Sequence, residues 1–250
     1  MSREIIIAGN WKMHKTSKEA NDFIEILTPL VEKTSTGIML AVPFTAIANA
    51  SHIAKGTNII VGAQNINDHD KGAFTGEISS IMLKEAGAEF VIVGHSERRH
   101  IFKEDDDLIN KKVKRAILDD ITPILCVGET EKERDEKNNE KVVKRQIEMG
   151  LDGVSVEDIE KVIIAYEPVW AIGTGKTATP EIAEMAHLFI RDCIKNIFGK
   201  RVSDKILILY GGSVKPENTK SLISCENIDG ALVGGAALDP QSFAKIVKSC

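Results

Sequence analysis

Three side chains able to carry acid–base or charge chemistry stand just after apolar, strand-like runs of the sequence: Glu167, His95 and Lys12. A carboxylate can move a proton, a neutral imidazole can donate an N–H to a substrate oxygen, and a lysine can supply positive charge. Parallel α/β sheets and barrels place their catalytic groups at the carboxyl ends of strands, so we expect the three at one rim. Taken singly, each also has a plain structural explanation, as a surface acid, a structural histidine or a solvated lysine.

Glu167 lies near the start of segment 165–178, which reads Ala-Tyr-Glu-Pro-Val-Trp-Ala-Ile-Gly-Thr-Gly-Lys-Thr-Ala. Pro168 removes a backbone donor and stiffens the exit from the strand. Gly173 and Gly175 allow the tip to bend, and their N–H groups can approach an anion closely. We interpret this segment as an anion-binding lid attached to a catalytic base. The alternative is an ordinary strand-to-helix loop with one surface glutamate.

Glycine-bearing loops end three consecutive predicted strands, at 173–175, 211–213 and 234–235. Backbone N–H groups after the last two strands of a barrel recurrently form a phosphate cradle, which suits an acidic protein because it needs no basic side chains. The alternative is that these glycines only turn tight corners. A P-loop is a weak match because Trp170 stands where that motif needs a glycine, and a dinucleotide site is weak because the fingerprint does not directly follow a strand.

His95, Ser96 and Glu97 are adjacent, at the expected start of a helix. Consecutive residues there point in different directions, so they cannot form a Ser–His–acid relay. The positive end of a helix disfavours imidazolium, so we expect His95 to be neutral. The other histidines lack metal-ligand spacing and we expect no metal site, while Cys126 is expected to be a packing residue without a nearby base.

Composition limits the classes of partner and the cellular compartment that we expect for this protein. A net charge of −5 argues against nucleic acid or an anionic membrane surface as the partner, and no apolar run is long enough to span a bilayer. Four cysteines stand far apart with no Cys-x-x-Cys pair, and the first residues enter a strand pattern without a signal-peptide layout. We therefore expect a cytoplasmic protein with reduced cysteines.

Short runs rich in Val and Ile alternate with charged segments of helical period, as expected for parallel strands covered on both faces. The predicted strands are 5–8, 38–42, 59–63, 90–93, 122–127, 162–165, 206–210 and 230–233. The predicted helices are 17–33, 45–55, 79–86, 105–119, 139–150, 180–198, 216–224 and 240–248. About eight strand–helix units in this length predict one (β/α)8 barrel domain over residues 1–250, with a doubly wound sheet as the alternative.

Together these residues resemble the triosephosphate isomerase family over the whole chain. The motifs that carry the resemblance are Gly9-Asn-Trp-Lys-Met13, Gly72-Ala-Phe-Thr-Gly-Glu77, Gly94-His-Ser-Glu-Arg-Arg99, the segment 165–180, Tyr210-Gly-Gly-Ser213 and Val233-Gly-Gly-Ala236. The resemblance implies a cofactor-free isomerase of glycolysis and gluconeogenesis that interconverts dihydroxyacetone phosphate and D-glyceraldehyde 3-phosphate through an enediol(ate). Another phosphosugar barrel enzyme and a non-catalytic phosphoanion-binding protein are the alternatives.

The resemblance also implies roles for single residues. Glu167 would be the base and His95 the neutral electrophile, with Lys12 supplying charge and Asn10 orienting the substrate. The residues implied to bind phosphate are Gly173, Ser213, Gly234 and Gly235, and those implied to support the site are Ser96, Glu97, Ile172, Tyr210 and Thr75.

The loop 65–79 has an apolar tip, 73–75, that is poorly suited to project freely into water. The resemblance implies a homodimer in which this loop enters a second subunit and Thr75 reaches that subunit's Asn10 and Lys12. Two residues depart from the family pattern. His14 stands beside the expected interface where Asn is common, so a pH-dependent dimer is a hypothesis, and Ala237 stands where Ser is common.

Overall fold

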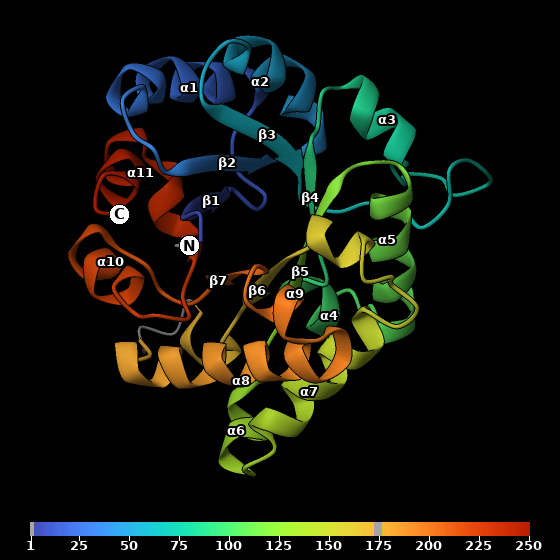
Figure 1. Ribbon diagram of the computed structural model, residues 1–250. Coiled ribbons are helices and arrows are strands. Elements are labelled where there is room, and N and C mark those ends of the chain that lie inside the picture. The colour runs from blue at the N-terminus through green and yellow to red at the C-terminus, as the bar shows by residue number, and fades with distance from the viewer. Residues whose placement is uncertain (1–2, 173–176) are drawn as a thin grey trace.

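Eight short apolar runs pair in chain order into a closed ring of parallel strands, as a computed structural model shows for residues 3–172 and 177–250 (Figure 1). The strands are β1 (Ile6–Asn10), β2 (Gly37–Val42), β3 (Ile59–Ala63), β4 (Phe90–Val93), β5 (Thr122–Val127), β6 (Ile163–Tyr166), β7 (Leu207–Tyr210) and β8 (Gly230–Val233). The ring closes where Ile6 pairs with Gly230. The predicted barrel is therefore confirmed, and the doubly wound sheet is wrong because its sheet would be open.

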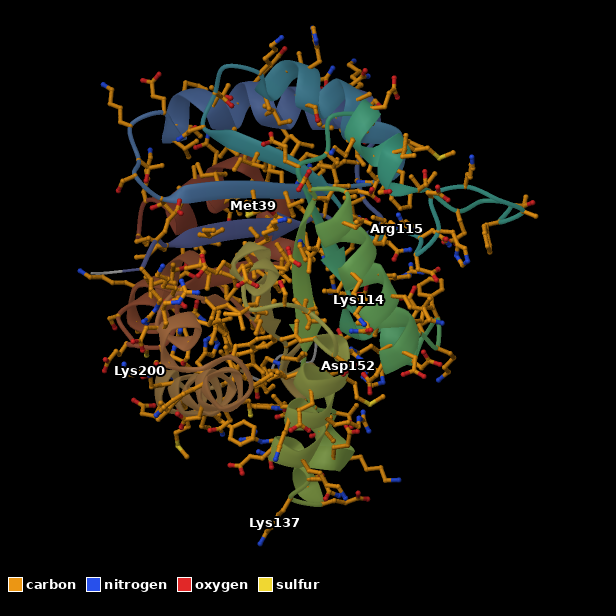
Figure 2. The ribbon with its side chains drawn as sticks, turned by 45° about the vertical axis from the view of Figure 1, so that its right-hand side comes forward. Met39, Lys114, Arg115, Lys137, Asp152 and Lys200 are labelled. Atoms are coloured by element: carbon orange, nitrogen blue, oxygen red, sulfur yellow. The ribbon has the colours of Figure 1, made fainter. Side chains whose placement is uncertain are left out.

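Alternate residues of each strand face two different cores. In β5, Ile124 and Cys126 pack inside the ring, whereas Leu125 and Val127 pack against the outer helices. Met39 of β2 belongs to the inner set and is marked in Figure 2 among the strands. Because both faces are buried, the strands are apolar throughout and their polar residues are confined to the ends.

Helices cover the outside of the ring, and Lys137, in a turn of this layer, extends away from the molecule (Figure 2). They are α1 (Ser17–Val31), α2 (Ile47–Ala54), α3 (Ser80–Glu85), α4 (Ser96–His100), α5 (Asp106–Leu118), α6 (Glu131–Asp135), α7 (Asn139–Gly150), α8 (Pro180–Phe198), α9 (Lys200–Ser203), α10 (Pro216–Ile223) and α11 (Pro240–Val247). Helices α8, α10 and α11 begin at the prolines predicted to start them, because a proline at the first position loses no intrahelical bond.

Local signals explain where the helices differ from prediction. The predicted helix 45–55 is a 3₁₀ turn, Phe44–Ala46, followed by α2. Helix α6 lies outside the predicted ranges and forms because Thr130 and Glu133 make a capping box for it. The left-handed backbone of Lys137, with φ of 57°, separates it from α7, which matches the predicted helix 139–150. Helix α9 was not predicted.

The loop between β3 and α3 projects beyond the helical layer (Figures 1 and 2). Its two sides are joined by the Asn67 Nδ2 to Glu77 Oε2 hydrogen bond of 2.8 Å, and the rings of His69 and Phe74 lie 4.3 Å apart. The loop is therefore braced by its own side chains. Among the described residues, no helix has both the length and the apolar composition needed to cross a membrane.

Barrel closure makes Gly230 a sensitive position. Its φ is +144°, and a Cβ there would stand 1.8 Å from the carbonyl oxygen of Ile6. We expect Gly230→Ala to lower the free energy of unfolding by about 3 kcal/mol or more, because backbone strain adds to a clash with a backbone that cannot move aside. Urea unfolding at fixed protein concentration measures this change.

Gly199→Ala is the matched control. Gly199 also has a positive φ, +87°, but no atom of the described part of the chain lies within 4 Å of where its Cβ would be. It should show the backbone strain alone, on the order of 1–3 kcal/mol, and so the smaller loss. Equal losses for the two variants would contradict a steric role for Gly230 at the seam of the barrel.

Candidate active site

The carboxyl ends of the strands surround a cavity of about 560 Å³. Four of the residues predicted to do the chemistry line it: Asn10, Lys12, His95 and Glu167. The rest of the wall includes Ile172, Gly211, Gly212, Ser213, Gly234 and Gly235. The predicted side chains and two of the three glycine loops are thus brought to one site.

Glu167 follows β6 directly and is only 2% exposed. One carboxylate oxygen lies 3.0 Å from Nε2 of His95, and the other accepts the backbone N–H of Ser96 at 2.9 Å. Both oxygens are thus paired, as a buried charge requires. Among the described residues, the contact between Ser96 and Glu167 is made by the Ser96 backbone N–H.

His95 is the N-cap of α4, and its Nδ1 accepts the backbone N–H of Glu97 at 3.2 Å. An accepting Nδ1 carries no proton, so in the neutral ring the proton is on Nε2. Nε2–H then donates to Glu167. This hydrogen-bond pattern fixes the tautomer whose N–H faces the cavity, which is the one that could polarise a substrate oxygen.

The contact between the two side chains shifts both pKa values. Burial opposes the charged form of Glu167, but the charge and hydrogen bond of His95, helped by the Ser96 N–H, hold the pKa of Glu167 below its usual value. Burial likewise opposes protonation of His95, but the Glu167 carboxylate, and more weakly Glu97, raise its pKa. Two influences therefore oppose each other at His95: the acceptor role of Nδ1 favours the neutral ring, and Glu167 favours the charged one.

The sequence alone considered only the helix N-terminus at His95 and missed the carboxylate across the rim. We assign the neutral ring to this arrangement. In imidazolium Nδ1 would also carry a proton, and two N–H donors, those of Nδ1 and of the Glu97 backbone, would then face each other.

Lys12 enters the cavity from the end of β1. Its Nζ lies 2.6 Å from Oε1 of Glu97, so the charge pair expected across the rim is present. The backbone of Lys12 has a left-handed φ of 52°, and its N–H is held by Oδ1 of Asn10 at 3.0 Å. A non-glycine residue adopts this conformation at a cost, so the asparagine side chain stabilises a strained turn that aims the lysine.

The loops after β7 and β8 form the glycine-lined wall. Gly234 precedes a short 3₁₀ helix, Gly235–Leu238, and a Cβ at Gly235 would meet no atom of the described residues within 4 Å. Asn218 steadies the other loop, because its amide donates to the carbonyl of Ser213 at 3.0 Å and accepts the N–H of Lys215 at 2.8 Å. A wall of glycines next to a lysine leaves room for an anion to approach backbone N–H groups.

Part of the predicted lid can be located. Ile172 lines the cavity, whereas Gly173 lies outside the described residues. The Tyr210 hydroxyl is buried without a normal hydrogen bond among the described residues. Its burial raises its pKa to about 12, an effect partly opposed by the nearby backbone of Ala178. The role of Tyr210 in holding a closed lid stays a prediction.

Glu129 does not line this cavity but holds residues that precede and follow Glu167, and sequence reasoning gave it no role. It is buried just past β5 and accepts from Trp170 Nε1 at 2.9 Å and from the Tyr166 hydroxyl at 3.1 Å. Arg134 pairs with the same carboxylate at 3.1 Å and lies 4.4 Å from the centroid of the Trp170 ring. The segment just after β6 is therefore anchored next to the end of β5. The available signal was an acid directly after an apolar strand with an arginine one turn further on.

The two residues that depart from the family pattern, His14 and Ala237, lie at different places relative to the cavity. His14 is exposed and lines the cavity. Ala237 is fully buried, and a Cβ on Gly9 would meet its methyl at 3.1 Å, so it packs against β1 behind the wall. Thr75 is exposed on the projecting loop and does not line the cavity of its own chain.

Comparison with known proteins agrees with this geometry. The family model described as triosephosphate isomerase matches residues 5–250. The chain is 51% identical over 245 residues to the triosephosphate isomerase of Caldanaerobacter subterraneus subsp. tengcongensis, covering 98% of this chain and 99% of that one. It is 50% identical to those of Protochlamydia amoebophila, over 98% of this chain and 93% of that one, and Fusobacterium nucleatum, over 99% of each.

The Glu167–His95 contact leads to a testable prediction for the pKa of His95. We expect Glu167→Gln to lower the pKa of His95, because the carboxylate that favours imidazolium is removed while the burial that opposes it stays. An NMR titration of the imidazole resonances measures the shift. Glu97→Gln should give a smaller fall, since that carboxylate is partly exposed and lies 3.6 Å from Nδ1. An unchanged pKa in Glu167→Gln would contradict the contact.

Proposed function

Because the chain belongs to the triosephosphate isomerase family, we propose that it interconverts dihydroxyacetone phosphate and D-glyceraldehyde 3-phosphate in glycolysis and gluconeogenesis. We assign this cofactor-free activity to one (β/α)8 domain, residues 1–250, in the cytoplasm. The observation that carries the proposal is a buried carboxylate 3.0 Å from an imidazole, beside a cavity wall built of glycine loops.

Glu167 acts as the base. It removes a proton from C1 of dihydroxyacetone phosphate while His95 donates its Nε2 proton to the oxygen on C2, which forms an enediol. Glu167 then returns its proton to C2, and the oxygen on C1 gives its proton back to His95, which leaves the aldehyde. The close approach of the two groups supports these roles, since both must reach adjacent atoms of a three-carbon substrate. To act, the carboxylate exchanges its present partners for the substrate C–H.

Lys12 and Asn10 complete the charged side of the site. Lys12 supplies positive charge where the enediolate oxygens become negative, and Asn10 orients the substrate and holds the turn that carries the lysine. Glu97 supports both Lys12 and His95, because its carboxylate pairs with one and its N–H is accepted by the other.

Phosphate is held by backbone N–H groups of Gly173, Ser213, Gly234 and Gly235. Ile172 covers the base when the lid closes, and Tyr210 holds the closed lid near Ala178. Closure excludes water, which matters because a solvent-exposed enediolate phosphate can eliminate its phosphate. The anchoring of Trp170 by Glu129 supports a lid that moves about a fixed start.

The active form is a homodimer made through the loop 65–79. Apolar side chains are exposed on that loop and on neighbouring segments after β1 and β4, as shown by Phe74 at 41%, Met13 at 95% and Phe102 at 63%. An exposed phenylalanine at the tip of a braced, projecting loop, with exposed apolar side chains on two other segments, supports a protein interface. In the dimer Thr75 reaches Asn10 and Lys12 of the partner subunit.

Replacement of the base tests the mechanism. We expect Glu167→Gln to lower kcat by at least about 10²-fold, because the amide keeps the side-chain shape but cannot take a proton. A coupled assay that consumes dihydroxyacetone phosphate, started with glyceraldehyde 3-phosphate in the presence of a chelator, measures it. Glu157→Gln, an exposed glutamate, should leave kcat unchanged. Unimpaired turnover of Glu167→Gln would contradict the assignment, and loss of all activity on chelation would contradict a metal-free reaction.

Replacement of the loop tip tests the dimer. We expect Phe74→Asp to produce monomers with reduced activity, because a charge at the loop tip opposes its burial in a partner. Sedimentation equilibrium gives the dissociation constant. Met185→Asp, at an exposed apolar residue of α8, should leave the dimer intact. An intact dimer in Phe74→Asp would contradict the interface, and a dissociation constant that stays flat across the histidine titration range would contradict the His14 hypothesis.

A further inference from the structure

Gln146 of α7 is bound to both backbone groups of a single glycine at the end of β5. Its Oε1 accepts the N–H of Gly128 at 2.7 Å, and its Nε2 donates to the carbonyl of the same residue at 3.2 Å. Gln146 is 2% exposed and does not line the substrate cavity. A buried side chain that satisfies both polar groups of one residue fixes the position of that residue, because either group would otherwise lack a partner.

Gly128 packs directly against the backbone of Glu167. A Cβ on Gly128 would stand 1.8 Å from the carbonyl oxygen of Glu167 and 2.6 Å from its carbonyl carbon. Gly128 is not among the glycines with positive φ, so glycine is required there by space and not by conformation. Any movement of Gly128 is therefore passed to Glu167 by contact.

Hydrogen bonds on both sides of Gly128 continue the pairing of β5 and β6 past the strand ends. The N–H of Glu167 donates to the carbonyl of Val127 at 2.8 Å, and the N–H of Val169 donates to the carbonyl of Glu129 at 3.1 Å. Gly128 lies at the centre of this extension. The clamp on Gly128 therefore governs the segment from which the Glu167 side chain departs.

A second glycine closes the other side of Glu167. The N–H of Gly211 donates to the carbonyl of Tyr166 at 2.7 Å, and a Cβ on Gly211 would meet Cγ of Glu167 at 2.9 Å. Glu167 is thus held between Gly128 and Gly211, with little room to absorb a displacement of either.

We propose that Gln146 is a positioning residue for the base: by clamping the Gly128 peptide it holds the backbone of Glu167 and so places its carboxylate. This inference rests on the proposed role of Glu167. Because Gln146 lies away from the glycine loops after β7 and β8, its loss acts on proton transfer and spares phosphate binding. Sub-ångström placement of a reacting group carries large rate factors, which is why a residue that touches no substrate can control turnover.

Gln146→Met is the principal variant, since it keeps the length of the side chain and removes both hydrogen bonds. We expect kcat to fall about 10- to 100-fold, with KM and the inhibition constant of inorganic phosphate changed by less than about twofold. The pKa of His95 should fall as well, because the carboxylate 3.0 Å from its Nε2 is displaced. That titration reports the position of Glu167 independently of turnover.

Asn110→Leu is the matched control. Asn110 of α5 is a buried amide that donates to the carbonyls of Gly150 and Asp152 at 3.1 and 3.0 Å, so its loss destabilises the protein in a comparable way away from Glu167. It should lower the melting temperature without lowering kcat per folded molecule or shifting the pKa of His95. A Gln146→Met enzyme with kcat and His95 titration like those of Asn110→Leu would overturn the inference.

Gln146→Glu is a second variant that tests the same proposal if Gln146→Met does not fold. At neutral pH the introduced carboxylate accepts from the Gly128 N–H but cannot donate to its carbonyl, so kcat should be reduced. Protonation of that carboxyl restores a donor, and kcat relative to the native enzyme should rise as the pH falls. A pH-independent ratio would overturn the proposed clamp.

Glu167→Gln measured in the same series separates the two levels of inference. If Glu167→Gln keeps full activity, the assignment of the base fails. If Glu167→Gln is inactive while the Gln146 variants match Asn110→Leu, only the positioning role of Gln146 fails.

Discussion

The contact between the Glu167 carboxylate and the His95 imidazole is the interaction on which the site depends, and barrel closure makes it possible. Strand β5 pairs on one side with β4 and on the other with β6, in registers that bring Leu125 opposite Val93 and Val127 opposite Tyr166. The residues that follow β4 and β6 therefore emerge at the same rim. Because the ring is closed, neither strand can slide without breaking pairs all round the barrel.

Burial makes this pairing necessary. An isolated buried carboxylate would take up a proton or recruit water, but Glu167 has His95 and the Ser96 N–H as partners and stays charged. The result is a buried carboxylate kept ionised next to the imidazole of His95. The Lys12–Glu97 pair is partly exposed, so its contribution is to the field at the rim more than to stability.

Around this contact the position of Glu167 is fixed by close backbone packing at glycines and by buried polar side chains. Gly128 and Gly211 leave room for the Glu167 backbone and side chain, and Gln146 fixes one of those glycines from the helical layer. Glu129 ties Trp170, which follows β6, to the end of β5. Both of these contacts therefore fix the backbone next to Glu167, the residue proposed as base.

The sequence by itself determined the barrel and its rim. Continuous Val- and Ile-rich runs, each followed by a segment of helical period, predict parallel strands covered on both faces, and prolines at 180, 216 and 240 mark helix starts that the structure confirms. The position of Glu167, His95 and Lys12 at strand ends follows from the same pattern. These are local signals, carried within a few residues of each element.

Only the tertiary structure decided which groups touch. It paired Glu167 with His95, which raises the pKa of His95, and it paired Lys12 with Glu97. It also connected Trp170 to Glu129 and Gly128 to Gln146. The last two contacts join residues 41 and 18 positions apart. The physical reason is that a side chain's partners and its desolvation depend on atoms brought near by closure of the ring, and neither hydrophobic period nor motif spacing records those distances.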